Sequence, residues 1–311
     1  MNRTLNRTLN RTLANQKTVS VAVCAGIVML ALVAACVAET VSSGAAVAVP
    51  IADMYSSFSE DTDVVSQAIF GTNVMVLERH DNWLRIQTPD QYTGWTRQTW
   101  IQELPILAHD YAVSGKVAQV ISLSASLYRE TDITAHHPVL TIPFESRLEV
   151  VHEGGGSDPE RWLQVRLPDQ SLAWVQRGDI TLNAKTLSIP ESIELARRFI
   201  GVTYRWGGMS SLGYDCSGFT QMLVHSRGIL MPRDADQQAA WQGVAPVERR
   251  HLKAGDLLFF GEAADKITHT GMSIGHGEFI HDTVHGHPGV QISRLKDKPW
   301  TDLLVAARRV K

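Results

Sequence analysis

The most reactive side chain in the folded part of this sequence is a single thiol, Cys216. The chain of 311 residues contains three cysteines, and the other two, Cys24 and Cys36, lie in an apolar run near the N-terminus. A lone thiol cannot form an internal disulfide or a cysteine-rich metal site. Cys216 is therefore either a small buried hydrophobic residue or a nucleophile.

The position of Cys216 favours the second reading. It begins a segment, 216–227, whose apolar residues recur at helical spacing. Free backbone N–H groups and the dipole at a helix start favour a thiolate and can bind an oxyanion. A free thiol has a pKa of ~8.5, so it needs a base at neutral pH. The negative charge of Asp215 opposes activation, so we expect Asp215 either to cap the helix or to bind substrate.

Twelve histidines compete for the role of base. His269 heads one β-type run and His281 ends the next, with Gly275-His276-Gly277 between them. This arrangement predicts a hairpin that brings His269 and His281 side by side, as a base and its orienting residue require. Taken alone, either histidine is more often a surface or packing residue.

The elements around these residues indicate an α+β fold. Helices are predicted over 191–200, following Pro190, and over 216–227, with Gly201 and Gly228 as their stops. Short β-type runs follow at 256–260, 271–274, 278–281 and 289–292. Helices that precede an antiparallel sheet are typical of the α+β class.

A repeat precedes this part of the chain. WLRIQTPDQYTGW at 83–95 and WLQVRLPDQSLAW at 162–174 share six of thirteen residues at a constant offset of 79. Each copy alternates apolar and polar residues, breaks at Pro-Asp-Gln and resumes before a tryptophan, as in a β-hairpin. Two copies indicate tandem small domains rather than a solenoid. They resemble two bacterial SH3-like barrels, at 47–107 and 113–185.

The C-terminal motifs resemble the NlpC-type cell-wall peptidase domain, which has a papain-like fold. The similarity covers 188–311. It rests on six motifs in order: YRWGG at 204–208, GYDCSGF at 213–219, PRD at 232–234, KAGDLLFF at 253–260, HTGM at 269–272 and FIH at 279–281. The resemblance implies that Cys216 is the nucleophile, His269 the base and His281 its orienter, and that Tyr204 faces the oxyanion.

Two SH3-like domains before such a domain resemble the γ-D-glutamyl-L-diamino acid endopeptidases of peptidoglycan peptides. In those enzymes a free N-terminal L-alanine is bound by acidic and polar side chains. The resemblance assigns this role to Asp215, Ser217 and Tyr92. The repeat places Ser171 opposite Tyr92, so the barrel motif does not require the tyrosine. An acidic residue from Glu60, Asp61 or Asp63 is expected to join them.

One departure from the subfamily concerns position 235. Ala235 stands where related enzymes often carry a serine in the amine site. One hydrogen bond to the ammonium group would then be missing, worth ~1.5–3 kcal/mol if nothing replaces it. The departure affects the free-amine specificity and leaves the catalytic residues untouched.

The N-terminus is typical of an export signal. Arg3, Arg7, Arg11 and Lys17 precede an uncharged apolar run that ends in Ala34-Ala35-Cys36. We expect a signal peptide over 1–36 with lipidation of Cys36, or else cleavage nearby or an uncleaved anchor. A tether is predicted over 37–46. The remainder would then be held at a membrane in the cell envelope, facing the periplasm or the exterior.

These expectations describe an exported cysteine peptidase that cleaves the γ-D-glutamyl–diamino acid bond. The alternatives are an endopeptidase on intact cross-linked wall, a non-catalytic wall-binding module and, more distantly, acyl transfer. No cofactor is expected, and His136-His137 and His285-Gly286-His287 lack the partners of a zinc site. The net charge of -3 gives no basic field for nucleic acid.

Overall fold

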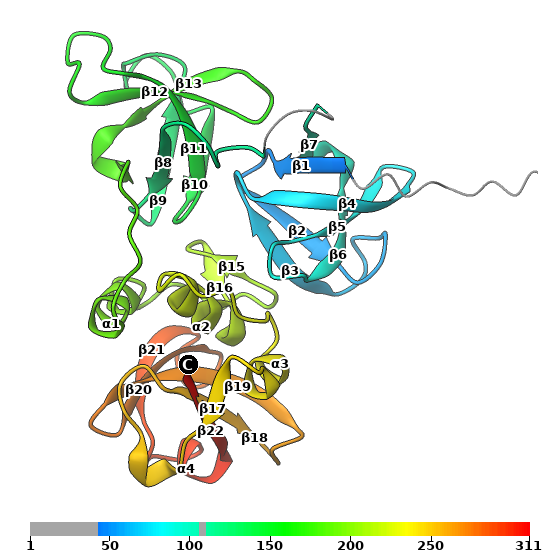
Figure 1. Ribbon diagram of the computed structural model, residues 1–311, viewed down its shortest axis with the longest axis vertical. Helices are drawn as coiled ribbons and strands as arrows, with labels where there is room; N and C mark the ends of the chain where they lie inside the picture. Colours follow the sequence, from blue (N-terminus) through cyan, green and yellow to red (C-terminus); the bar gives the residue numbers. More distant parts are fainter. Residues whose placement is uncertain (1–42, 106–109) are drawn as a thin grey trace, which may run out of the picture. The chain divides into compact units, whose positions relative to one another are not determined.

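The structure is a computed structural model that describes residues 43–105 and 110–311 (Figure 1). The expected signal segment, with Cys24 and Cys36, lies outside the described residues. Within the described ranges, no helix is both long and apolar enough to cross a membrane.

The first β domain is a seven-stranded antiparallel sheet in the order β3-β2-β6-β5-β4-β1-β7. Its strands are β1 (Ser43–Val47), β2 (Ile51–Tyr55), β3 (Val64–Ile69), β4 (Asn73–His80), β5 (Trp83–Gln87), β6 (Thr93–Arg97) and β7 (Ile101–Glu103), with a 3-10 turn η1 (Gln98–Trp100) before the last. The repeat tryptophan Trp83 is buried, and Met54, Leu84 and Ile86 form the centre of the core.

The predicted tether over 37–46 is wrong at its C-terminal end. Ser43–Val47 form β1, which pairs with β4 on one side and β7 on the other. Ala45 and Ala46 are fully buried. Small residues suggested a linker, but here they fit a strand enclosed between β4 and β7 in a tightly packed sheet.

The second β domain repeats the first. Its strands are β8 (Val117–Val120), β9 (Ser124–Tyr128), β10 (Leu140–Pro143), β11 (Arg147–Glu153), β12 (Trp162–Arg166), β13 (Leu172–Gln176) and β14 (Ile180–Thr181), with η2 (Arg177–Asp179) before the last. Their order, β10-β9-β13-β12-β11-β8-β14, is that of the first sheet strand for strand. The common topology is what the sequence repeat predicts.

The remaining residues form the α+β part that the sequence predicted. Its helices are α1 (Ile189–Arg197), α2 (Cys216–His225), α3 (Ala235–Ala240) and α4 (Trp300–Leu303), with a 3-10 turn η3 (Arg249–His251). Its strands are β15 (Met209–Ser210), β16 (Gly213–Tyr214), β17 (Val244–Pro246), β18 (Leu257–Gly261), β19 (Ile267–Gly275), β20 (Glu278–Thr283), β21 (Gly289–Arg294) and β22 (Leu304–Val310). The main sheet has the order β17-β22-β18-β19-β20-β21.

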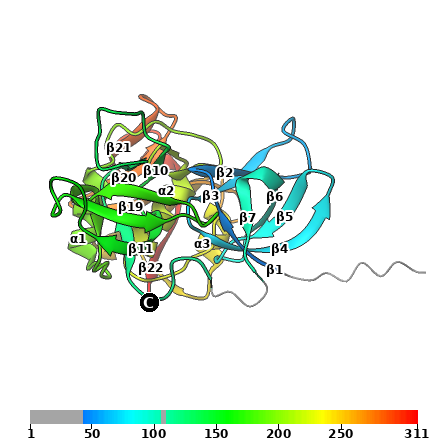
Figure 2. The ribbon, with the colours of Figure 1, turned by 90° about the horizontal axis from the view of Figure 1, so that it is seen from above.

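Helix α2 lies against the β19–β20 part of this sheet (Figures 1 and 2). Its apolar residues Phe219 and Leu223 pack with Phe259 of β18 in one core. Asp215 caps the helix, because its carboxylate accepts the backbone N–H of Gly218 at 2.7 Å. The start of α2 is thereby held over the strands that carry His269 and His281.

Candidate active site

Cys216 is the first residue of α2, and its side chain is almost fully buried at 8% exposure. The backbone N–H of Thr270 in β19 faces the thiol and lowers its pKa, as does the backbone N–H of Ser217. Burial and the charge of Asp215 act more strongly, so the pKa of the Cys216 thiol is raised overall. The Cys216 side chain is therefore a protonated thiol at rest.

The two predicted histidines meet, as the hairpin prediction required. His269 in β19 and His281 in β20 are joined by a hydrogen bond of 2.7 Å between Nε2 of His269 and Nδ1 of His281. Nε2 of His281 lies 3.0 Å from the Oγ of Ser293 in β21. Three neighbouring strands thus hold a line of polar groups that fixes both rings.

Aromatic packing keeps these rings in place. Trp300 of α4 is buried, and its ring centroid lies 5.2 Å from that of His269 and 4.7 Å from that of His281. Phe260 packs against His269 from β18 at 5.7 Å. Burial lowers the pKa of both histidines, so the unliganded site holds neutral imidazoles.

The hydrogen-bond line couples the tautomers of the two rings, so the proton on His281 sets which nitrogen of His269 can act as base. If His281 donates its Nε2 proton to Ser293, its Nδ1 is an acceptor, and His269 must donate from Nε2. Nδ1 of His269 is then unprotonated and free to take the thiol proton. Each tautomer follows from its neighbour, which is the task of an orienting residue in a catalytic triad.

Tyr204 lies close to the Cys216 thiol, whose charge acts on its hydroxyl. It forms a parallel bridge with Tyr214, the residue two positions before Cys216. Burial raises the pKa of the Tyr204 hydroxyl, followed by the charges of Cys216, Asp215 and Asp282. The hydroxyl therefore stays protonated and can donate a hydrogen bond near the thiol, as an oxyanion donor must.

Asp215 and Ser217 lie together, and Arg233 binds both. Arg233 donates to the two carboxylate oxygens of Asp215 at 3.0 and 2.6 Å and to the Oγ of Ser217 at 2.7 Å. The guanidinium is buried, and its Nε also donates to Ser66 of the first β domain at 3.1 Å. Burial alone would lower the pKa of Arg233, but the charge of Asp215 raises it overall.

Tyr92 reaches this group from the first β domain. The Asp234 carboxylate lies near its hydroxyl, and burial followed by that charge raises the pKa of Tyr92 to about 12. The pKa of Asp234 is itself raised, chiefly by burial. Asp234 in the PRD motif thus supplies the acid that lies beside Tyr92.

The acidic loop of the first domain is placed differently from the expectation. Glu60 accepts from Arg97 at 2.8 Å within its own domain, and the backbone N–H of Asp61 bonds Ser59. Among the described residues, Glu60, Asp61 and Asp63 make no hydrogen bond or ion pair with the C-terminal part. They are not brought to Tyr92 by any contact seen here.

Sequence reasoning missed the roles of Arg233, Asp234 and Ser293. The PRD motif was visible, but Arg233 lies eighteen positions from the Asp215 that it binds. Ser293 is an ordinary strand residue until β21 pairs beside β20. In the sequence, these residues look like solvated charges or an ordinary serine. Only the contacts that they make in the folded protein show otherwise.

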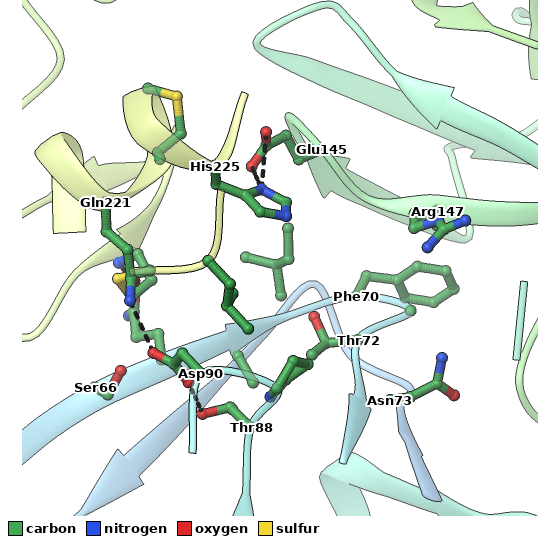
Figure 3. A pocket seen from close by; sticks show the side chains of 18 of the residues that line it. Ser66, Phe70, Thr72, Asn73, Thr88, Asp90, Glu145, Arg147, Gln221 and His225 are labelled. Atoms are coloured by element: carbon green, nitrogen blue, oxygen red, sulfur yellow. Dashed lines mark hydrogen bonds and ion pairs between the residues drawn. The ribbon is translucent and has the colours of Figure 1, made fainter. Parts of the chain in front are cut away.

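A separate cavity of about 380 Å³ is lined by residues of all three folded regions (Figure 3). Within it, His225 of α2 lies 3.3 Å from both carboxylate oxygens of Glu145, and Gln221 donates to Asp90 at 2.9 Å. Neither Cys216 nor the two histidines line this space. The cavity is therefore distinct from the thiol–imidazole site.

Comparison with known families agrees with this geometry. The NlpC/P60 family model matches residues 201–309, which include every member of the thiol–histidine arrangement. The C-terminal domain belongs to the NlpC/P60 family. The chain is thus a cysteine peptidase with a papain-like NlpC/P60 domain, and a bacterial dipeptidyl-peptidase SH3 domain matches residues 54–99.

Relatives of this NlpC/P60 protein cover most of its length. A γ-D-glutamyl-L-lysine dipeptidyl-peptidase of Bacillus cereus is 29% identical over 78% of this chain and 74% of its own. One of Bacillus subtilis is 28% identical over 80% of this chain and 82% of its own. The murein DD-endopeptidase MepH of Escherichia coli is 39% identical, but over only 36% of this chain and 42% of its own.

A solved structure has the same fold. The crystal structure of an NlpC/P60 family protein from Bacillus cereus matches 86% of this chain and 99% of its own, with a TM-score of 0.74 and 23% sequence identity. At that identity the match supports the arrangement of the elements, not the substrate.

Proposed function

We propose that this peptidase hydrolyses the bond between γ-D-glutamate and a diamino acid in peptidoglycan-derived peptides. The observation that carries the proposal is that a thiol with a histidine pair and a tyrosine with a carboxylate lie in the same region of the protein. Cys216 with its histidine pair provides acyl-transfer chemistry, and Tyr92 with Asp234 provides an amine-binding corner beside it. The names of the Bacillus relatives, both γ-D-glutamyl-L-lysine dipeptidyl-peptidases, support this substrate.

The reaction follows from the tautomers of the site. Nδ1 of His269 takes the proton of Cys216 as the sulfur attacks the γ-carbonyl carbon. The Tyr204 hydroxyl and the N–H groups at the start of α2 stabilise the oxyanion. His269 returns the proton to the leaving amine of the diamino acid. Water, deprotonated by His269, then hydrolyses the thioester and restores the thiol.

The amine corner explains a preference for peptides that begin with free L-alanine. Asp215 and Ser217 are held by Arg233, so their charge is partly neutralised. Asp234 lies beside Tyr92 and accepts a hydrogen bond from the Gln237 side chain at 3.0 Å, and among the described residues it makes no ion pair, which leaves its carboxylate to receive an ammonium group. In this arrangement the Asp234 carboxylate compensates for the missing serine hydroxyl at position 235, where this chain has Ala235.

Two peptides that differ at one group test the proposal. Wild type and Cys216→Ala are incubated with L-Ala-γ-D-Glu-diamino acid and with its N-acetylated form, and products are identified by mass spectrometry. We expect wild type to release L-Ala-γ-D-Glu from the free peptide only, and Cys216→Ala to release nothing. Equal cleavage of both peptides would contradict the free-amine preference.

An endopeptidase that acts on intact wall is the second candidate, favoured by the similarity to the Escherichia coli DD-endopeptidase. That similarity spans only 36% of this chain, whereas the Bacillus dipeptidyl-peptidases match 78% and 80% of it, which is more than the catalytic domain alone. Release of soluble peptides from purified cross-linked sacculi, with no activity on the free peptide, would favour this alternative. Sacculus binding without turnover would indicate a wall-binding module.

We also propose that the chain is exported and held at a membrane through lipidated Cys36. The proposal is supported by the basic start, the apolar run and the Ala34-Ala35-Cys36 ending of the N-terminal segment. Cys36→Ser should move the protein from the membrane fraction to the soluble envelope fraction. Unchanged fractionation would show that lipidation does not anchor it.

A further inference from the structure

Two buried polar side chains directly follow the two histidines of the site. Thr270 follows His269 in β19, and Asp282 follows His281 in β20; both are fully buried. Side chains alternate between the two faces of a strand, so both point away from the histidine face. Thr270 pairs with Phe259, which belongs to the core beneath α2, so this is the face that α2 covers.

The strand register places the two side chains together. Met272 pairs with Ile280 in the antiparallel β19–β20 ladder. Continued by two residues, the same register sets Thr270 opposite Asp282 on one face. A hydroxyl and a carboxyl thus lie across adjacent strands, beneath the start of α2.

Neither side chain is satisfied by the protein. Among the described residues, Oγ1 of Thr270 and both carboxyl oxygens of Asp282 have no partner at full hydrogen-bond geometry, although the backbone N–H of Thr283 lies near enough to lower the pKa of Asp282. An unpaired buried carboxyl is costly, and a charged one much more so. A native protein that retains such a group needs a reason beyond packing.

The surroundings of Asp282 connect it with the nucleophile. Its charge acts on the Tyr204 hydroxyl, on which the charge of Cys216 also acts. The backbone N–H of its neighbour Thr270 faces the Cys216 thiol. Burial, followed by the charge of Asp215, raises the pKa of Asp282 to about 8. Its carboxyl is therefore mostly neutral at pH 7.

We propose that Asp282 keeps a neutral carboxyl near Tyr204, opposite the strand residue whose N–H faces Cys216, and that, once ionised, it opposes the negative charge that forms on the thiolate and on the oxyanion. Thr270 is the hydroxyl available to donate to the carboxylate when it forms. The inference rests on the proposed nucleophilic role of Cys216.

The neighbouring groups with shifted pKa values titrate outside the pH range in which Asp282 ionises. The pKa values of Tyr204, Tyr214 and the Cys216 thiol are raised by burial, and those of both histidines are lowered by it. The groups whose charge or N–H acts on Asp282, or on which its charge acts, are Asp215 at the start of α2, Tyr204, Tyr214 of β16 and Thr283 of β20, and the strand register adds Thr270. A change in thiol reactivity near pH 8 can therefore be assigned to Asp282.

Thiol alkylation tests the inference without any peptide. The full chain is treated with iodoacetamide from about pH 6 to 10, and modification of Cys216 is followed by peptide mass spectrometry. We expect Asp282→Asn to match wild type below about pH 7 and to react roughly 3- to 10-fold faster above pH 8, a change of up to one unit in thiol pKa. Coincident profiles would overturn the role.

Thr270 provides matched variants. Thr270→Val removes the hydroxyl that can stabilise the carboxylate, so the wild-type inflection should move to higher pH. Thr270→Ser should keep it in place. If both variants behave alike, Thr270 does not act on Asp282.

Thermal unfolding separates this role from a folding defect. The pKa of Asp282 is higher in the folded than in the unfolded protein. The free energy of unfolding of wild type therefore falls as pH rises from about 4 to 8, whereas the neutral amide of Asp282→Asn adds no such fall. The melting temperature of Asp282→Asn relative to wild type should rise across that window, and a constant difference would contradict a neutral buried acid. If the alkylation and unfolding profiles are as expected but the peptide is not cleaved, the proposed function is rejected and the role of Asp282 stands.

Discussion

The two β domains contain the same turn, but among the described residues only the turn of the first domain makes a hydrogen bond to the C-terminal domain. Gln91 and Gln170 both adopt φ of 69°, and their N–H groups bond Thr88 and Leu167 alike at 2.9 Å. In each copy the next residue, Tyr92 or Ser171, bonds back to the aspartate of the turn.

The difference between the turns lies in what their side chains reach. Ser171 donates its hydroxyl to Asp169 of its own turn at 2.6 Å. Tyr92 instead reaches Asp234 of the catalytic domain, and Asp90 accepts a hydrogen bond from Gln221 of α2. The same backbone turn thus reaches the C-terminal domain in the first copy, through the Tyr92 and Asp90 side chains, without any change of backbone.

The largest difference between the domains should appear in their arginine contacts. Arg233, which joins the first domain, is buried and paired with Asp215, whereas Arg198 bonds Ile121 of the second domain at the surface. Arg233→Met should lower the free energy of unfolding by ~3–5 kcal/mol, because it leaves a buried carboxylate unpaired. Arg198→Met should cost less than ~1 kcal/mol. Urea denaturation measures both, and equal losses would remove the contrast.

Exchanging the side chains of the two turns tests the contrast directly. Tyr92→Ser should lower kcat/KM for the free-amine peptide by ~10- to 100-fold, the value of a hydrogen bond to a charged group. The N-acetylated peptide should show no such change. Ser171→Tyr is the control and should leave both values as in wild type. A similar loss in both variants would mean that the turn, not Tyr92, matters.

The aspartates of the turns differ by one contact. Asp90→Ala loses the turn bond and the bond from the buried Gln221, whereas Asp169→Ala loses only bonds within its own turn. We expect Asp90→Ala to lower the free energy of unfolding by ~1–2 kcal/mol more than Asp169→Ala. Comparable losses in thermal or urea unfolding would show that the contact with α2 adds no stability.

The smallest expected effect is a pH dependence confined to the Tyr92 side. Asp234 has a raised pKa, so as pH falls its carboxylate is protonated earlier than an ordinary aspartate and loses the charge that attracts an ammonium group. KM for the free-amine peptide should rise a few-fold, about 2- to 5-fold, between pH 6 and pH 4. Asp234→Asn should have a uniformly high KM without this slope. Cleavage by Ser171→Ala should keep the wild-type profile.

The sequence by itself determined the local features. Strand alternation and the glycines between the runs predicted the hairpin that joins His269 to His281, and helical spacing placed Cys216 at the start of α2. The repeat predicted two domains of one topology. These features depend on short-range periodicity and turn chemistry, which are legible in neighbouring residues.

Only the tertiary structure decided the long-range partners. The pairing of Arg233 with Asp215, the choice of Asp234 rather than Glu60 beside Tyr92, and the placing of Thr270 opposite Asp282 depend on packing and strand order. Even the small residues of β1 resembled a linker until the sheet enclosed them. Burial turns ordinary polar residues into a site, because away from water an unpaired polar group is costly and the interaction between charges is stronger.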